Sequence, residues 1–210
     1  MPVFSQRSAL IVGFMMMGLI LVITGCGGGD GDGDNGMTTV SGQVNLPSNS
    51  TNLGGGGTAV ANTQFVVIDF EKPNPNDASG SGFQTIGSGT TDSTGKYQTT
   101  VSQTSAAAVI AGGTQPSGPQ QGKVVPVSGL VNLTQDTVSK NYDGTTTIAC
   151  FAGLRAIAQG RITPQQLDAG RISNCERAAA AFVATTNFLD NNSIVASADQ
   201  VRQITNECAR

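Results

Sequence analysis

Short apolar runs separated by turn-forming residues occupy the middle of the chain, about residues 38–134. Apolar and polar positions alternate in several of these runs, and Gly, Pro or Asn residues end them, which is typical of short β-strands. The candidate strands are residues 39–44, 64–70, 96–101, 107–111, 123–127 and 129–133. This pattern predicts an antiparallel β-sandwich. Insertions rich in Gly, Ser and Pro at 47–58, 71–82 and 112–122 leave the number of strands open.

The apolar pattern becomes helical after Asp143, where Gly and Pro become rare and Ala becomes frequent. One helix is expected over 146–159, followed by Gly160 as the residue that ends it. A second is expected to start at Thr163, because Thr-Pro-Gln-Gln supplies an N-cap residue and a Pro at the first helical position. A third is expected from Ser197. The predicted fold class is therefore α+β, a sandwich over 38–134 followed by a small three-helix region over 143–210.

The first 25 residues have the pattern of an export signal. Arg7 is their only charged residue, and residues 9–23 form an uncharged apolar run. As a helix this run would be about 22 Å long, which is shorter than the roughly 30 Å hydrocarbon core of a bilayer. We therefore expect a cleaved signal peptide over 1–25 rather than a permanent membrane span.

The leader ends in Ile23-Thr24-Gly25-Cys26, which resembles the lipobox of bacterial lipoproteins. The resemblance implies diacylglyceryl on the thiol of Cys26, cleavage before this residue, and acylation of the new amino terminus. Acyl chains contribute about 0.8 kcal/mol per buried CH₂, so that more than one chain anchors a protein stably. The expected partner is thus a cell membrane, bound through lipid on Cys26. Gly27 in the next position favours, in this family, the outer membrane if the cell is Gram-negative.

The segment 26–37 is dominated by Gly and Asp and cannot bury apolar surface, so we predict a flexible tether. Asp30, Asp32 and Asp34 have the spacing of the first three ligands of an EF-hand loop. The sixth and twelfth positions of that loop would be Asn35 and Ser41, where Gly and a bidentate Glu are needed. No folded metal site is therefore expected.

The segment Thr91-Asp92-Ser93-Thr94-Gly95-Lys96-Tyr97 has the chemistry of a tight turn before a strand. Asp92 can accept hydrogen bonds from backbone N–H groups of the turn, and Gly95 can adopt a positive φ. Tyr97 would then be the first residue that faces the core. This segment is predicted to be a turn with a structural role.

The same segment resembles the T-D-x-x-G-x-[YF] motif of bacterial carboxypeptidase-regulatory-like domains, which have the transthyretin-like (prealbumin-like) sandwich fold. Ser41-Gly42-Gln43-Val44 resembles the short first strand of this family, and Val66-Val67-Ile68-Asp69 resembles a following hydrophobic strand. The resemblance implies a non-catalytic domain that serves folding support, spacing, or contact with protein or glycan.

Three cysteines remain besides Cys26, and Cys150, Cys175 and Cys208 each lie on the apolar face of a predicted helix. Export to an oxidising compartment favours a disulfide. Antiparallel helix packing could pair Cys175 with Cys150 or with Cys208, and counting alone does not choose between them. We favour Cys175–Cys208, because the short third helix gains most from a covalent link. The remaining thiol is expected to be buried and inert, with an intermolecular disulfide as the alternative.

The chain contains no His, which removes the commonest general base and the commonest metal ligand. Its charged content of 12% and net charge of −3 argue against a nucleic-acid partner. We expect a lipid-anchored, non-catalytic structural or binding module of the cell envelope, without a cofactor. One alternative is an accessory subunit of an export or adhesion complex. Another is a hydrolase that uses the carboxylates of Asp69, Glu71 and Asp92.

Overall fold

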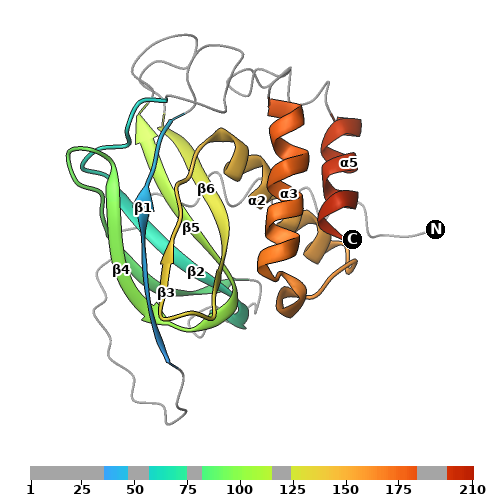
Figure 1. The fold of residues 1–210 in the computed structure, drawn as a ribbon, viewed down its shortest axis with the longest axis horizontal. Coiled ribbons are helices and arrows are strands. Elements are labelled where there is room, and N and C mark those ends of the chain that lie inside the picture. The colour runs from blue at the N-terminus through green and yellow to red at the C-terminus, as the bar shows by residue number, and fades with distance from the viewer. Residues whose placement is uncertain (1–35, 47–56, 75–81, 115–123, 184–197) are drawn as a thin grey trace. The chain divides into compact units, whose positions relative to one another are not determined.

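Seven strands pair into two sheets in the computed structural model, which describes residues 36–46, 57–74, 82–114, 124–183 and 198–210 (Figure 1). The strands are β1 (Met37–Gln43), β2 (Gln64–Pro73), β3 (Phe83–Thr90), β4 (Lys96–Ser102), β5 (Thr104–Thr114), β6 (Val124–Leu133) and β7 (Thr137–Ser139). One sheet has the order β4-β1-β7, and the other has the order β3-β2-β5-β6. The pairing of β1 with β7 is parallel, and the other strand pairs are antiparallel.

The two sheets face each other across one apolar core. Alternate residues of the strands point into it, as expected from the two-residue period of a strand. Phe65 of β2 and Tyr97 of β4 meet edge to face with ring centroids 5.3 Å apart. The core is completed by Val40, Val44, Leu46, Val60, Val67, Val101, Ala107, Val109, Ala111, Val127, Val131, Leu133 and Tyr142.

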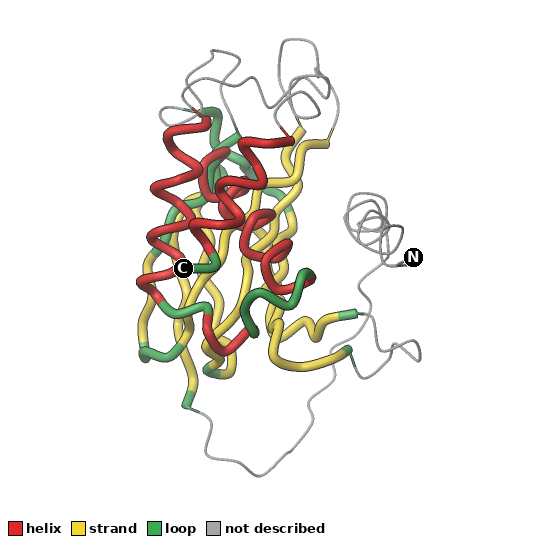
Figure 2. The backbone as a smooth tube through the Cα atoms, turned by 90° about the vertical axis from the view of Figure 1, so that its right-hand side faces the viewer, coloured by secondary structure: helices red, strands yellow, loops and turns green. Residues whose placement is uncertain are grey.

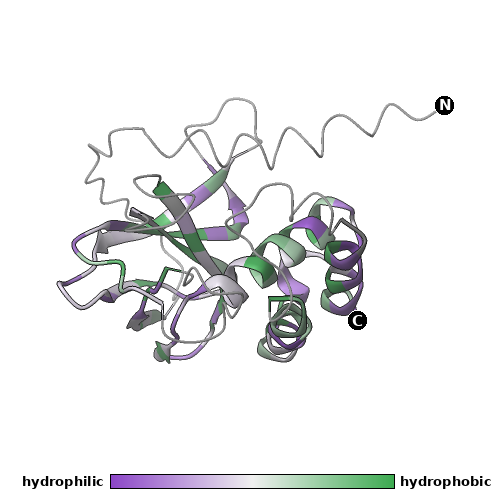
Figure 3. Ribbon diagram, turned by 90° about the horizontal axis from the view of Figure 1, so that it is seen from above, coloured by the Kyte–Doolittle hydropathy of each residue, from purple (hydrophilic) through white to green (hydrophobic). Residues whose placement is uncertain are grey.

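A helical layer covers the outer face of the four-stranded sheet (Figures 2 and 3). It comprises α2 (Gly144–Ala158), the 3₁₀ helix η1 (Pro164–Gln166), α3 (Ala169–Val183) and α5 (Ala198–Cys208). Small residues on β5 let this layer approach closely, since Ala106 and Ala108 face it. On the helix side, a Cβ on Gly153 of α2 would lie 2.6 Å from Cδ1 of Leu130. The four-stranded sheet is thus packed on both faces.

Helix α2 begins where its N-terminal backbone groups find a side-chain partner. The backbone N–H of Thr146 donates to Oδ1 of Asp143 at 3.0 Å, and the backbone N–H of Asp143 donates to Oγ1 of Thr146 at 2.9 Å. Such a reciprocal capping box satisfies two groups that a helix start otherwise leaves unpaired. The Oγ1 of Thr146 also donates to the carbonyl of Ser128 at 2.9 Å, which ties the start of the helix to β6.

The start of the second helix differs from the prediction at Thr163. Residues 164–166 form only one 3₁₀ turn, and the α-helix begins at Ala169. Asp168 caps it, because its Oδ1 accepts from the backbone N–H of Arg171 at 2.8 Å. Leu167 separates the two segments with a ψ of 62°, which is not helical, and its side chain is fully buried. Burial of this leucine against the sheet outweighs the local signal for a continuous helix.

The predicted α+β class, with a sandwich followed by three α-helices, is confirmed. The sheets are mainly antiparallel, as predicted, but β7 pairs in parallel with β1 and lies beyond the predicted strand segment 38–134. Strand β3 was not predicted. Strands β2 and β5 extend to Pro73 and Thr114, into the segments 71–82 and 112–122 that the pattern indicated as insertions. The extension of β5 pairs with β6 from Gly112 to Thr114.

We predict that Gly153→Ala lowers the free energy of unfolding by about 1–3 kcal/mol, because the added methyl group would overpack the contact with Leu130. The loss is expected although Ala favours helices over Gly. Ser173→Ala, on the exposed face of α3, is the control and should change the free energy of unfolding by less than about 0.5 kcal/mol. Urea unfolding of the three proteins measures the effect. Equal stability of Gly153→Ala and the natural protein would contradict the tight packing of α2 on β6.

Candidate functional site

The turn at Asp92 is built by hydrogen bonds to a single carboxylate oxygen. Oδ1 of Asp92 accepts from the backbone N–H of Thr94 at 2.7 Å, from the hydroxyl of Thr94 at 2.8 Å and from the backbone N–H of Lys96 at 3.0 Å. These bonds, the one from the Thr94 hydroxyl above all, lower the pKa of Asp92 below its ordinary value of 3.8. The carboxylate is exposed, but the groups that donate to its Oδ1 all belong to the same turn.

Gly95 and Tyr97 occupy the positions that the turn chemistry predicts. Gly95 has a φ of +77°, and a Cβ there would lie 2.9 Å from the carbonyl oxygen of Val44. A side chain at this position would therefore be both strained and obstructed. Tyr97 is buried in the core between the two sheets, and its hydroxyl donates to the carbonyl of Lys140 at 2.9 Å. Burial is the main cause that raises the pKa of Tyr97 above its ordinary value.

The Asp92 turn also connects neighbouring segments that are distant in sequence. The backbone N–H of Val44 donates to the carbonyl of Gly95 at 2.9 Å, and the backbone N–H of Asn62 donates to the carbonyl of Asp92 at 3.2 Å. The side-chain amide of Gln43 donates to the carbonyl of Thr94 at 2.8 Å. The turn therefore joins the end of β1, the approach to β2 and the start of β4, and this geometry gives it a structural role.

A polar cluster of Asp69, Glu71, Thr104 and Ser105 lies where β2 and β5 meet. The hydroxyl of Thr104 donates to Oδ1 of Asp69 at 2.9 Å and lies 3.1 Å from Oε2 of Glu71. The hydroxyl of Ser105 donates to Oε1 of Glu71. Asp69 is fully buried, and its Oδ2 lies 3.7 Å from Nζ of Lys72. The two carboxylates are thus held by hydroxyl groups and one ammonium group of the same chain.

The carboxylates that suggested a hydrolase are not brought into one cleft. Register pairs Gln64 with Thr90 at one end of β2 and Asp69 with Gln84 toward the other end. Asp92 lies two residues beyond Thr90. The distance along the strand from its level to that of Asp69 is therefore at least five residues, roughly 17 Å. Asp69 and Glu71 form one cluster, whereas Asp92 belongs to the turn at the opposite end.

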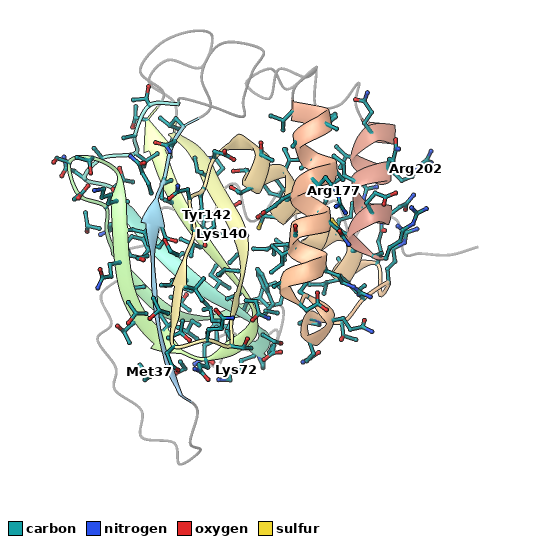
Figure 4. All side chains as sticks on the ribbon, in the orientation of Figure 1. Met37, Lys72, Lys140, Tyr142, Arg177 and Arg202 are labelled. Atoms are coloured by element: carbon teal, nitrogen blue, oxygen red, sulfur yellow. A yellow bond between two sulfur atoms is a disulfide. The ribbon has the colours of Figure 1, made fainter. Side chains whose placement is uncertain are left out.

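Lys140 links both sheets to the helical layer, and sequence analysis did not identify it. Its Nζ donates to the carbonyl of Leu130 on β6 at 2.9 Å and lies 2.5 Å from Oε1 of Glu176 on α3. The residue follows β7, and Figure 4 shows it next to Tyr142 at the core. Both members of the ion pair are partly buried, which strengthens their attraction relative to an exposed pair. No local pattern in the sequence brings Lys140 and Glu176 together.

The structure contains a disulfide between Cys175 and Cys208, which confirms the pairing that we favoured. It links α3 to α5 across 33 positions of the chain. Cys150 is a free cysteine, buried where α2 packs on the sheet. Burial raises the pKa of Cys150 to about 11, against opposing effects of a hydrogen bond with Ser128 and the charge of Lys140. The Cys150 thiol therefore stays protonated near neutral pH and is a poor nucleophile.

A hollow of about 420 Å³ lies between α3 and α5. Phe182 and Ile204 form its buried floor, and polar side chains form its walls. The lining residues are Asn174, Arg177, Ala178, Ala181, Phe182, Gln200, Gln203, Ile204 and Glu207. Sequence analysis did not identify this site, because its lining residues come from two helices that meet only in the folded chain.

Cys26 and nearly all of the predicted tether lie outside the residues that the structure describes. Among the described residues, no helix is long and apolar enough to cross a bilayer. The same part of the chain holds no group of three or more Cys, Asp or Glu side chains arranged to bind a metal ion.

Comparisons with known proteins found distant likenesses among solved structures. A scan against models of protein families and a search of curated proteins found no match. A double mutant of the shaft pilin SpaA from Lactobacillus rhamnosus GG is 13% identical, with 50% of this chain and 48% of the pilin covered and a TM-score of 0.29. A 9R-lipoxygenase from Cyanothece PCC8801 is 11% identical, with 82% of this chain and 28% of the lipoxygenase covered and a TM-score of 0.28. The chain spans less than half of either protein, and TM-scores this low establish no common fold.

We predict that Asp92→Asn lowers the free energy of unfolding near neutral pH. The difference in unfolding free energy between the natural protein and the variant should become smaller as the pH falls. The folded-state pKa of Asp92 is lowered, so its contribution to stability is complete above the ordinary value of 3.8 and is lost as the pH falls through the folded value. Urea unfolding of both proteins between neutral pH and pH 3 measures the gap. Ser93→Ala, in the same exposed turn, is the control and should leave stability unchanged. A gap that does not depend on pH would contradict this role of the carboxylate.

We predict that the double variant Cys175→Ser and Cys208→Ser loses about 2–5 kcal/mol of unfolding free energy, because it lacks the covalent link between α3 and α5. A reducing agent should destabilise the natural protein and leave the double variant unaffected. Cys150→Ala keeps the disulfide and should retain the response to the reducing agent. Chemical unfolding with and without reductant measures the effect. If reductant left the stability of the natural protein unchanged, this result would argue against the disulfide.

Proposed function

We propose that this chain is a lipid-anchored, non-catalytic module of the bacterial cell envelope with a transthyretin-like sandwich domain. The observation that carries the proposal is Cys26, which stands in a lipobox sequence at the end of an apolar leader. Several acyl chains on this residue would hold the protein at a membrane without any spanning helix. Gly27 supports placement in the outer membrane if the cell is Gram-negative.

Three sequence motifs support the transthyretin-like assignment by their places in the fold. The Ser41-Gly42-Gln43-Val44 motif ends β1, and the Val66-Val67-Ile68-Asp69 motif lies within β2. The turn motif enters β4 with Tyr97 in the core. Each motif thus lies in a strand or a turn of the sandwich, as expected for residues that define a fold family.

The polar contacts of the candidate carboxylates support a non-catalytic role. Oδ1 of Asp92 accepts three hydrogen bonds from its own turn, Oδ1 of Asp69 accepts from the hydroxyl of Thr104, and Oε1 of Glu71 accepts from the hydroxyl of Ser105. A general acid or base needs a reachable proton in a cleft that also admits substrate. Asp92 instead holds the backbone of its own turn, Asp69 accepts from the backbone N–H of Glu71, and Glu71 joins β2 to β5 through the hydroxyl of Ser105.

The predicted tether joins the sandwich at the end of β1 that is opposite the Asp92 turn. Met37, the last residue of the predicted tether 26–37, already belongs to β1, and Figure 4 shows Met37 and Lys72 at the same end of the sandwich. Strand β1 runs from there to Gln43, which pairs with Lys96 beside the Asp92 turn. The start of β1, where the predicted tether joins the sandwich, and the Asp92 turn therefore lie at opposite ends of this strand.

The proposal predicts that the protein isolated from its cell begins at Cys26 and carries acyl groups on this residue. Cys26→Ser should abolish processing and acylation, because the serine hydroxyl does not replace the thiol in lipoprotein maturation. Mass spectrometry of the N-terminal peptide and separation of membrane from aqueous fractions make the measurement. Cys150→Ala is the control and should remain acylated. An intact Met1, or an unmodified thiol at position 26 in the natural protein, would refute the lipid anchor.

A further inference from the structure

The hollow between α3 and α5 has the size of a site for a small ligand. Its volume of about 420 Å³ falls in the range of roughly 300–1,000 Å³ that such sites occupy. Two small residues of α3, Ala178 and Ala181, face it, so that the space between the helices is not filled by side chains. Phe182 and Ile204 below them are 5% and 3% exposed and give the hollow an apolar floor.

The charges on the walls leave one cation available to a ligand. Glu207 is paired with Arg210, whose Nη1 lies 2.9 Å and 3.2 Å from its two carboxylate oxygens. Arg177 donates through Nη2 to the neutral side chain of Asn174. No ion pair joins Arg177 to a carboxylate within the described part of the chain. A guanidinium group with most of its donors free matches a carboxylate ligand, which it can bind in a bidentate manner.

The remaining wall residues match the polar groups of a peptide. Gln200 and Gln203 are exposed on α5, and each side-chain amide can both donate and accept a hydrogen bond. A peptide bond offers one donor and one acceptor in return. The hollow thus offers a guanidinium group for a carboxylate, two amides for peptide groups, and an apolar floor that is lined by small residues.

We propose that this hollow binds the free C-terminal end of a short peptide whose last residues are small and apolar. The terminal carboxylate would pair with Arg177, the peptide bonds would face Gln200 and Gln203, and the small side chains would lie on Phe182 and Ile204. The binding does not depend on the lipid at Cys26, so a failure of the anchor and a failure of this site are separate results.

Trialanine and trialanine amide, which differ only in the terminal charge, test the proposal. Each is titrated into the protein as purified from cells, and binding is followed by calorimetry and by chemical-shift changes of the α3 and α5 amides. Trialanine should bind with shifts confined to these helices, and the amide should bind at least about tenfold more weakly because it cannot pair with Arg177. Equal binding of both peptides, or binding of neither, would overturn the proposal.

Two pairs of variants locate the site. Arg177→Gln should weaken trialanine binding about tenfold, whereas Arg202→Gln should leave it unchanged. Figure 4 shows Arg202 on the outer side of α5, and it does not line the hollow. Ala181→Trp should fill the hollow and block binding, whereas Ala180→Trp, on the exposed surface of the same helix, should not. Unaltered affinity in Arg177→Gln would refute the assigned carboxylate partner even if a tryptophan variant failed to fold.

Discussion

Burial of the four-stranded sheet on both of its faces is the constraint on which the rest of this structure depends. One face packs against the three-stranded sheet through residues such as Phe65 and Val109, and the other packs against helices through Leu130 and Ala108. An inner strand of such a sheet cannot alternate strictly between apolar and polar residues, because both sets of its side chains are removed from water, whereas the edge strand β3 has no fully buried residue. Strand β5 meets the requirement with a nearly continuous run of Ala, Val and Ile from Ala106 to Ala111.

The two-sided packing also explains where sequence patterns succeeded and where they failed for the fold. Strand β2 was recognised because its run of large apolar residues is long and ends near prolines. Strand β3 was missed because Gly87 and Gly89 carry no apolar signal. Their lack of a side chain is required instead by Val101 and Phe65, which a Cβ at these positions would meet at 2.4 Å and 2.7 Å. That requirement comes from the opposite sheet and from a neighbouring strand, so it is invisible in a local window.

The candidate sites show the same contrast. A site whose contacts are local in the sequence could be predicted, and a site whose residues are distant in the sequence could not. The Asp92 turn could be predicted with its hydrogen bonds, because every partner of its carboxylate lies within four residues. The three-residue strand β7 pairs with β1 across almost 100 positions, and nothing in Thr137–Ser139 indicates it. The ion pair of Lys140 with Glu176 and the hollow beside Arg177 likewise follow from the packing of helices on the sandwich. The disulfide lies between these two cases, because counting positions did not exclude Cys150 and the shortness of the third helix favoured Cys208 as the partner of Cys175.

The sulfur bridge between α3 and α5 changes how the C-terminal end of the protein would respond to a cut. Cys208 lies in the last turn of α5, and its partner lies in the middle of α3. A single break of the main chain anywhere between the two helices would leave both fragments joined, with Ile204 still held in the apolar cluster that it shares with Phe182. Outside a reducing environment, one proteolytic nick would therefore not release the last helix.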